Sequence, residues 1–186
     1  GILFDLGDTL LHQQKFDTLS GSAHILKLAD NPNCCTPEDM QRVARELDTE
    51  IMPLREASMI ELTDECFQRL LYDILGLTFN LSYAELELEF WRACVEFSPG
   101  AGLYDVMDYL NAKGIRTGVV SNSMFSGEIL KWELERHNLL RYFNFVLSSA
   151  DYGIRKPHPL LFSVAVKKLH IPSSDVWFIG DNPEYD

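Results

Sequence analysis

Positive charge is scarce in this sequence. It has 16 Lys and Arg residues against 28 Asp and Glu residues, which gives a formal net charge of −12. Because binding to nucleic acids relies on Lys and Arg side chains that neutralise phosphates, this balance argues against a nucleic acid partner. It does not exclude a small phosphorylated ligand, which a metal ion and one or two local cations can hold.

Cysteine and long apolar runs are also sparse. The four cysteines form no CxxC pair, and no His lies at zinc-ligand spacing from two of them. We predict reduced thiols, with Cys66 and Cys94 buried on apolar helix faces. No signal peptide is recognisable, and no apolar run approaches the roughly 20 residues that span a bilayer. We therefore expect a cytoplasmic protein without a membrane segment.

Short apolar runs alternate with helical patterns at both ends of the chain. Four strands are predicted: Ile2–Phe4, Ile115–Ser121, Phe145–Ser148 and Val176–Gly180. Helices are predicted between the later strands, at residues 103–113, 126–137 and 159–169. This alternation is typical of βαβ units, which build a parallel sheet covered by helices on both faces.

The long middle segment has a different pattern. From residue 12 onward apolar residues keep helical spacing, with helix starts at Thr36-Pro37 and Ser82. A helix over Glu61–Leu75, ended by Gly76, would bury one apolar stripe: Leu62, Cys66, Leu70 and Ile74. We predict an α/β fold: a three-layer, Rossmann-like core with a parallel sheet (residues 1–11 and 100–186) and an inserted all-α cap (residues 12–99). The chain starts inside a strand and stops in a loop, so we expect the C-terminal part of the core to be truncated.

Polar side chains stand where three of the predicted strands end. Asp5 follows the first strand, Ser121 ends the second and Asp181 follows the last. If these strands are parallel, the three side chains gather at one edge of the sheet, where open α/β sheets bind ligands.

In these motifs the chain resembles the haloacid dehalogenase-like (HAD) hydrolase superfamily. The first motif of that family, Asp-x-Asp-x-Thr, corresponds to Asp5-Leu6-Gly7-Asp8-Thr9, and the second to Ser121. Its third motif, a Lys often followed by Pro, corresponds to Lys156-Pro157. Its fourth, Gly-Asp with a further acid, corresponds to Gly180-Asp181 and Asp186. The resemblance covers essentially the whole chain, and one class of these enzymes carries its cap directly after the first motif.

The resemblance implies a role for each of these residues. Asp5 would attack phosphorus and form an aspartyl-phosphate that water then hydrolyses. Mg²⁺ would be bound by Asp5, by the backbone carbonyl of Gly7 and by Asp181, with Asp186 or Glu184 holding a metal-bound water.

The remaining motif residues would bind the phosphate. Ser121, the backbone N–H of Asn122 and Thr9 would contact phosphoryl oxygens. Lys156 would neutralise charge on Asp5 and the phosphate together.

One position departs from the family pattern. Gly7 stands where the family has a second Asp, which usually protonates the leaving group, and Asp8 follows one place later. Either Asp8 supplies the acid, or substrate or water supplies the proton, or the site is catalytically weak. General acid catalysis typically contributes ~10²–10⁴-fold, so a protein without it would be a slow enzyme rather than an inactive one.

Three hypotheses on function follow. The first is a Mg²⁺-dependent hydrolase, a phosphatase acting on a small phosphorylated metabolite, with no nucleic acid or membrane partner. The second is a catalytically weakened module that binds a phosphorylated ligand for regulation. The third is a dehalogenase-type C–X hydrolase on the same fold. The sequence makes no prediction of oligomeric state.

Overall fold

Four short strands form the sheet at the centre of the protein. The computed structural model describes all residues from 1 to 186. The sheet has the order β5–β4–β1–β6, and all of its neighbouring strands are parallel. Its strands are β1 (Ile2–Phe4), β4 (Thr117–Ser121), β5 (Val146–Ser148) and β6 (Trp177–Ile179). The predicted parallel sheet is therefore confirmed.

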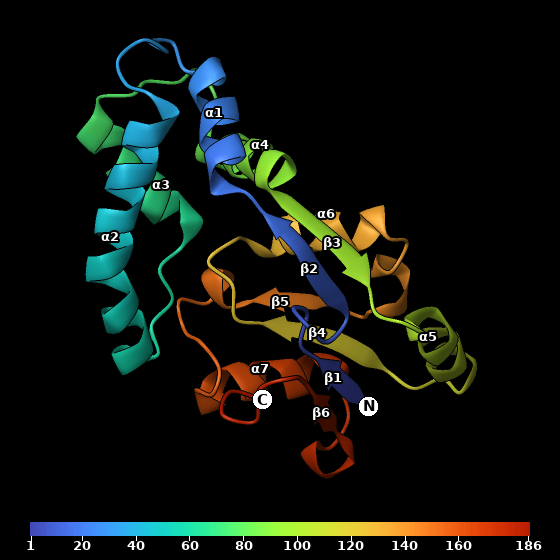
Figure 1. Ribbon diagram of the computed structural model, residues 1–186. Coiled ribbons are helices and arrows are strands. Elements are labelled where there is room, and N and C mark those ends of the chain that lie inside the picture. The colour runs from blue at the N-terminus through green and yellow to red at the C-terminus, as the bar shows by residue number, and fades with distance from the viewer.

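Helices cover both faces of this sheet, because successive residues of a strand point to opposite sides. Phe4 and Val119 pack in one cluster with α5 (Leu103–Ala112) and α6 (Gly127–Arg136). Leu3 and Val120 pack in another cluster with α7 (Pro159–Leu169). Figure 1 shows α7 on the side of the sheet opposite α6. The predicted three-layer arrangement is confirmed.

Four further helices form a bundle with an apolar core of its own. They are α1 (Thr18–Leu28), α2 (Pro37–Ser58), α3 (Asp64–Leu75) and α4 (Tyr83–Cys94). Thr36 caps the start of α2 as predicted and forms a capping box there, and Ser82 forms the predicted capping box at the start of α4. Gly76, with φ of 68°, ends α3 in the left-handed conformation that favours glycine. None of the helices is both long and apolar enough to cross a membrane.

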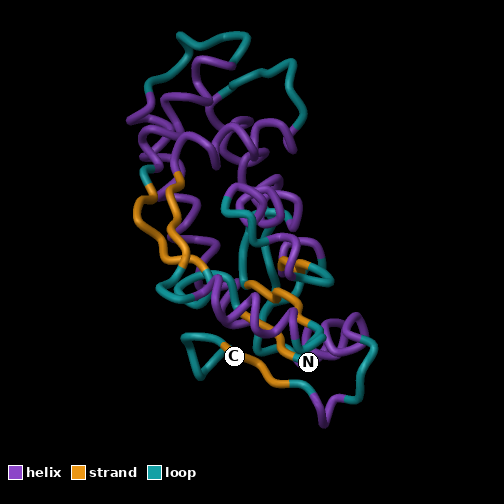
Figure 2. Tube along the Cα trace, turned by 90° about the vertical axis from the view of Figure 1, so that its right-hand side faces the viewer, coloured by secondary structure: helices purple, strands orange, loops and turns teal.

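A two-stranded antiparallel ribbon joins the bundle to the sheet, and it corrects the expectation of an entirely helical middle segment. Strand β2 (Leu11–Phe16) pairs with β3 (Val95–Pro99), and the two run side by side in Figures 1 and 2. The helical pattern predicted from residue 12 thus begins only at Thr18. The sequence of β2, LHQQKF, has little apolar periodicity, and its hydrogen-bonding partner lies about 80 residues away in the chain. The division into domains at residues 12 and 99 stays a prediction.

The orientation of α3 is also different from the prediction. Leu70 and Ile74 of the expected apolar stripe are exposed, and so is the thiol of Cys66. The prediction of a buried Cys66 is therefore wrong, whereas the prediction for Cys94 is confirmed. Helix α3 carries a second face, which includes Leu71, and it is this face that packs in the bundle core.

Candidate active site

Three carboxylates meet at the edge of the sheet where β1 and β6 end. Asp5, Asp181 and Asp186 each place a carboxylate oxygen within 4.8 Å of the others. The backbone N–H of Asp5 donates to the carbonyl of Ile179 at 2.9 Å, which continues the pairing of the two strands up to the acids. The structure therefore brings together the acids that follow the first and last strands. Glu184, the alternative to Asp186, is exposed and outside this group.

Asp186 reaches the other acids because the chain folds back tightly after Gly180. Its carboxylate accepts a hydrogen bond from the backbone N–H of Asn182 at 3.1 Å. A Cβ atom at Gly180 would lie 2.0 Å from an oxygen of this carboxylate. Only glycine leaves room for that approach, so Gly180 allows the carboxylate of Asp186 to reach the other acids.

Lys156 is buried between two of these acids. Its side chain is only 2% exposed, and its Nζ lies 3.1 Å from Asp5 Oδ1 and forms an ion pair with Asp186. Asn122 holds the backbone of this lysine: its Oδ1 accepts from the N–H of Lys156 at 2.7 Å, and its Nδ2 donates to the Lys156 carbonyl at 3.0 Å. The sequence did not reveal this function of the Asn122 side chain, because the two residues are 34 positions apart.

The charge balance of the site decides the protonation of Asp5. Burial raises the pKa of Asp5 above its ordinary value of 3.8, and the ion pair with Lys156 offsets part of that increase. Lys156 thereby favours the ionised form of Asp5, which is the form that can act as a nucleophile or as a ligand.

The donor set fits a hard divalent cation. One oxygen of Asp5, Oδ1, is buried and makes no hydrogen bond despite its proximity to Lys156. Three clustered carboxylates repel each other, and a single ammonium group does not balance their charge. Carboxylate oxygens are the ligands that Mg²⁺ prefers in proteins. Asp5 and Asp181 would be the protein ligands, with Asp186 beside them.

A cavity of about 260 Å³ lies next to this group, although neither the three acids nor Lys156 line it. Gly7, Ser121 and Asn122 line it from the sheet side, and Arg55 of α2 lines it from the bundle. Ser121 is buried at the end of β4. Thr9 has a buried hydroxyl without a partner, but it does not line the cavity. A larger groove, of about 700 Å³ between α4 and α6, contains none of the predicted residues.

The structure does not bring Asp8 into this cavity. Its side chain is 67% exposed and lies 3.6 Å from His12 Nδ1, and its backbone has a positive φ of 53°. Gly7, in contrast, faces the cavity, and a Cβ atom at Gly7 would meet nothing within 4 Å. The space for an acid is thus at position 7, while the acid itself is at position 8.

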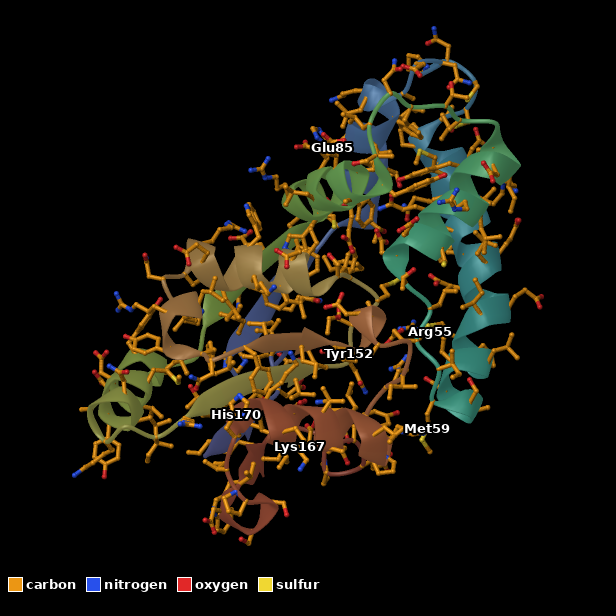
Figure 3. The ribbon with its side chains drawn as sticks, turned by 180° about the vertical axis from the view of Figure 1, so that it is seen from behind. Arg55, Met59, Glu85, Tyr152, Lys167 and His170 are labelled. Atoms are coloured by element: carbon orange, nitrogen blue, oxygen red, sulfur yellow. The ribbon has the colours of Figure 1, made fainter.

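A buried ionic cluster next to the site joins the bundle to the sheet core. Glu61 is fully buried and pairs through Oε1 with Arg55, while its Oε2 accepts from Ser149 Oγ at 2.6 Å and lies 3.7 Å from Arg155 Nε. Backbone hydrogen bonds accompany it, one of them from the N–H of Arg155 to the carbonyl of Met59 at 2.9 Å. Figure 3 shows Arg55 and Met59 at the end of α2 that approaches the sheet core. This cluster was not predicted from the sequence, because Ser149 and Arg155 lie far from Glu61 in the chain.

A family comparison agrees with this geometry. The sequence model of the haloacid dehalogenase-like hydrolase family matches residues 2–186. The chain belongs to this family. It is therefore a HAD-like hydrolase, as the motifs predicted.

Similar proteins of this family include phosphatases. A glyceraldehyde 3-phosphate phosphatase of Methanocaldococcus jannaschii is 23% identical over 190 residues, which cover 100% of this chain and 78% of that protein. A phosphoserine phosphatase of Thermus thermophilus is 29% identical over 86 residues, 45% of this chain and 34% of that protein. Among solved structures, a 2-haloacid dehalogenase from Pseudomonas syringae superposes with a TM-score of 0.63 at 22% identity, covering 100% of this chain and 79% of that one. This structural likeness shows the fold.

Proposed function

We propose that this HAD-like hydrolase is a phosphatase that acts on a small phosphorylated metabolite through an aspartyl-phosphate. The observation that carries the proposal is the convergence of Asp5, Asp181 and Asp186 around the buried Lys156. The similar proteins named as phosphatases of glyceraldehyde 3-phosphate and phosphoserine support it.

The residues of the chain would act as follows. The ionised carboxylate of Asp5 attacks phosphorus, a P–O bond forms, and the bond to the leaving alcohol breaks. Lys156 balances the charge of Asp5 and the phosphoryl oxygens, and the hydroxyl of Ser121 with the N–H of Asn122 donates hydrogen bonds to them. Water then cleaves the aspartyl-phosphate, which releases phosphate and restores Asp5. When bound, Mg²⁺ would supply Lewis-acid stabilisation of phosphoryl charge.

The phosphatase proposal is tested by measuring phosphate release from a panel of phosphorylated metabolites with Mg²⁺ or with EDTA. We expect release with Mg²⁺ and its loss with EDTA, because the three acids would otherwise repel the substrate phosphate. Binding of the panel compounds without any turnover would favour the regulatory module. Release of halide from 2-haloacids in the presence of EDTA would favour the dehalogenase.

The source of the leaving-group proton can be tested at positions 7 and 8. Since Gly7 faces the cavity and Asp8 does not, we expect Gly7→Asp to accelerate the release of poor leaving groups, by about 10²-fold at the lower end of general acid catalysis. We expect Asp8→Ala to leave kcat nearly unchanged. The measurement compares kcat for alkyl phosphates, which have poor leaving groups, with kcat for aryl phosphates. A selective loss with alkyl phosphates in Asp8→Ala would instead assign the acid to Asp8.

The pH dependence reports on Lys156. Because Lys156 lowers the raised pKa of Asp5, Lys156→Met should raise this pKa further. Activity needs ionised Asp5 and rises with pH through its pKa, so the acidic limb of the kcat/KM profile should move to higher pH. Lys167→Met, on the exposed surface of α7 (Figure 3), is the control that should keep the wild-type profile. If the acidic limb does not move in Lys156→Met, Lys156 does not control the pKa of Asp5.

A further inference from the structure

A second cavity, of about 180 Å³, lies inside the helical bundle. Most of its wall is apolar, including Met40 and Leu71, and the exposed Arg45 and Asp48 stand at its rim. Its volume would hold about six water molecules at ~30 Å³ each. It is therefore large enough for part of a small molecule.

Helix α3, which lines this cavity, buries two polar side chains and leaves two large apolar side chains exposed. Asp64 and Gln68, one turn apart on α3, are 4% and 3% exposed and line the cavity. On the same helix Leu70 and Ile74 are 43% and 59% exposed. The hydrophobic effect favours burial of apolar side chains, yet α3 buries Asp64 and Gln68 beside Leu71 and leaves two other apolar side chains in solvent.

These polar groups keep unused hydrogen-bonding capacity. Gln68 donates its amide N–H to Asp64, but its Oε1 is buried without a partner. Burial raises the pKa of Asp64 to about 8, with the charge of Glu87 as a smaller cause. Asp64 is therefore mostly protonated at neutral pH and offers its carboxyl group as a neutral partner. An unpaired buried carbonyl costs free energy that a ligand with a hydrogen-bond donor would recover.

This bundle cavity adjoins the cavity of about 260 Å³ that lies next to the three acids. Phe16, Met124 and Phe125 line both of them. Phe16, at the end of β2, is 46% exposed and is the least packed part of this partition. A substrate that has its phosphate at Asp5 and reaches Gln68 would therefore pass these three residues.

We propose that the bundle cavity binds the far end of the leaving group, and that the substrate is a phosphate monoester with an extended apolar chain ending in a hydroxyl group. The hydroxyl donates to Gln68 Oε1 and accepts from Asp64, while the apolar chain contacts the phenylalanines of the partition. This inference rests on the proposed phosphatase function for the position of the phosphate. The substrate proposed here is longer than the three-carbon compounds in the names of the similar proteins.

The experiment compares hexane-1,6-diol monophosphate with hexyl phosphate, which differ only in the terminal hydroxyl. We expect the wild type to prefer the diol ester by at least about tenfold in kcat/KM, because one hydrogen bond to a buried unpaired carbonyl is gained. The preference should arise from a lower KM for the diol ester. In Gln68→Met the ratio should fall to about one. Cys66→Ser, on the exposed face of α3, should keep the wild-type ratio. Thermal unfolding of each variant shows that it is folded.

A ratio of about one in the wild type, or a ratio that survives in Gln68→Met, would overturn the inference. If no monoester is hydrolysed, the phosphatase proposal fails, and calorimetric binding of the same two compounds decides the inference. Tighter binding of the diol ester that is lost in Gln68→Met supports it, and equal binding of the two overturns it.

Discussion

Replacing Asp5 with asparagine is expected to reduce phosphate release by at least about 10⁴-fold, the scale seen when a covalent nucleophile is removed from an enzyme. The amide has the shape of the carboxylate, so the packing around Lys156 is preserved. It has no anionic oxygen to attack phosphorus, and the route through an aspartyl-phosphate is closed. The measurement is phosphate release under single-turnover conditions with Mg²⁺, for wild type and variant side by side.

Two controls make this result specific to the nucleophile. Circular dichroism and thermal unfolding should show that Asp5→Asn keeps the fold. Acid quenching of the wild type during turnover of ³²P-labelled substrate should trap phosphate on the protein, and the variant should trap none. Turnover that persists at the wild-type rate in Asp5→Asn would refute both the nucleophile and the proposed mechanism.

Replacing Glu61 with glutamine should destabilise the protein by about 3–5 kcal/mol, because it leaves the buried guanidinium groups of Arg55 and Arg155 without their counter-charge. Glu61 is fully buried, with Arg55 and Arg155 only 11% and 15% exposed. Nη1 of Arg155 already lacks a hydrogen-bond partner, so one donor of the cluster is unsatisfied even with the carboxylate in place. For a chain of this size the melting temperature should fall by roughly 6–20 °C.

Glu65→Gln provides the matched control for this prediction. Glu65 pairs with Arg69 at 3.0 Å, but both side chains are more than half exposed. Loss of such a surface pair costs at most about 1 kcal/mol. Urea unfolding of both variants gives the comparison. Equal, small losses in the two variants would mean that the Glu61 cluster does not stabilise the attachment of the bundle to the sheet core.

The positions of the main site residues could be predicted because each depends on local structure. Asp5, Ser121 and Asp181 stand at strand ends that apolar runs and turn residues define within a few positions. Once those strands are parallel and adjacent, their polar ends must meet at one edge of the sheet. The helix caps at Thr36, Ser82 and Gly76 are equally local.

Features that depend on partners far apart in the chain could not be predicted. The β2–β3 ribbon was missed because its stability comes from main-chain hydrogen bonds between distant segments, whereas the periodicity of LHQQKF is weak. The buried face of α3 was predicted incorrectly because an apolar stripe indicates a buried face only when a neighbour covers it. In the bundle, that neighbour covers the face of Asp64 and Gln68 instead.

The sequence by itself determined the family motifs, the order of strands and helices, and which acids stand at the ends of strands, since these follow from short-range periodicity and turn chemistry. Only the tertiary structure decided which atoms meet. It placed Asn122 against the backbone of Lys156, Glu61 between two arginines, and Gly7 rather than Asp8 at the cavity. Such contacts depend on how segments tens of residues apart pack together, and packing is a property of the whole fold.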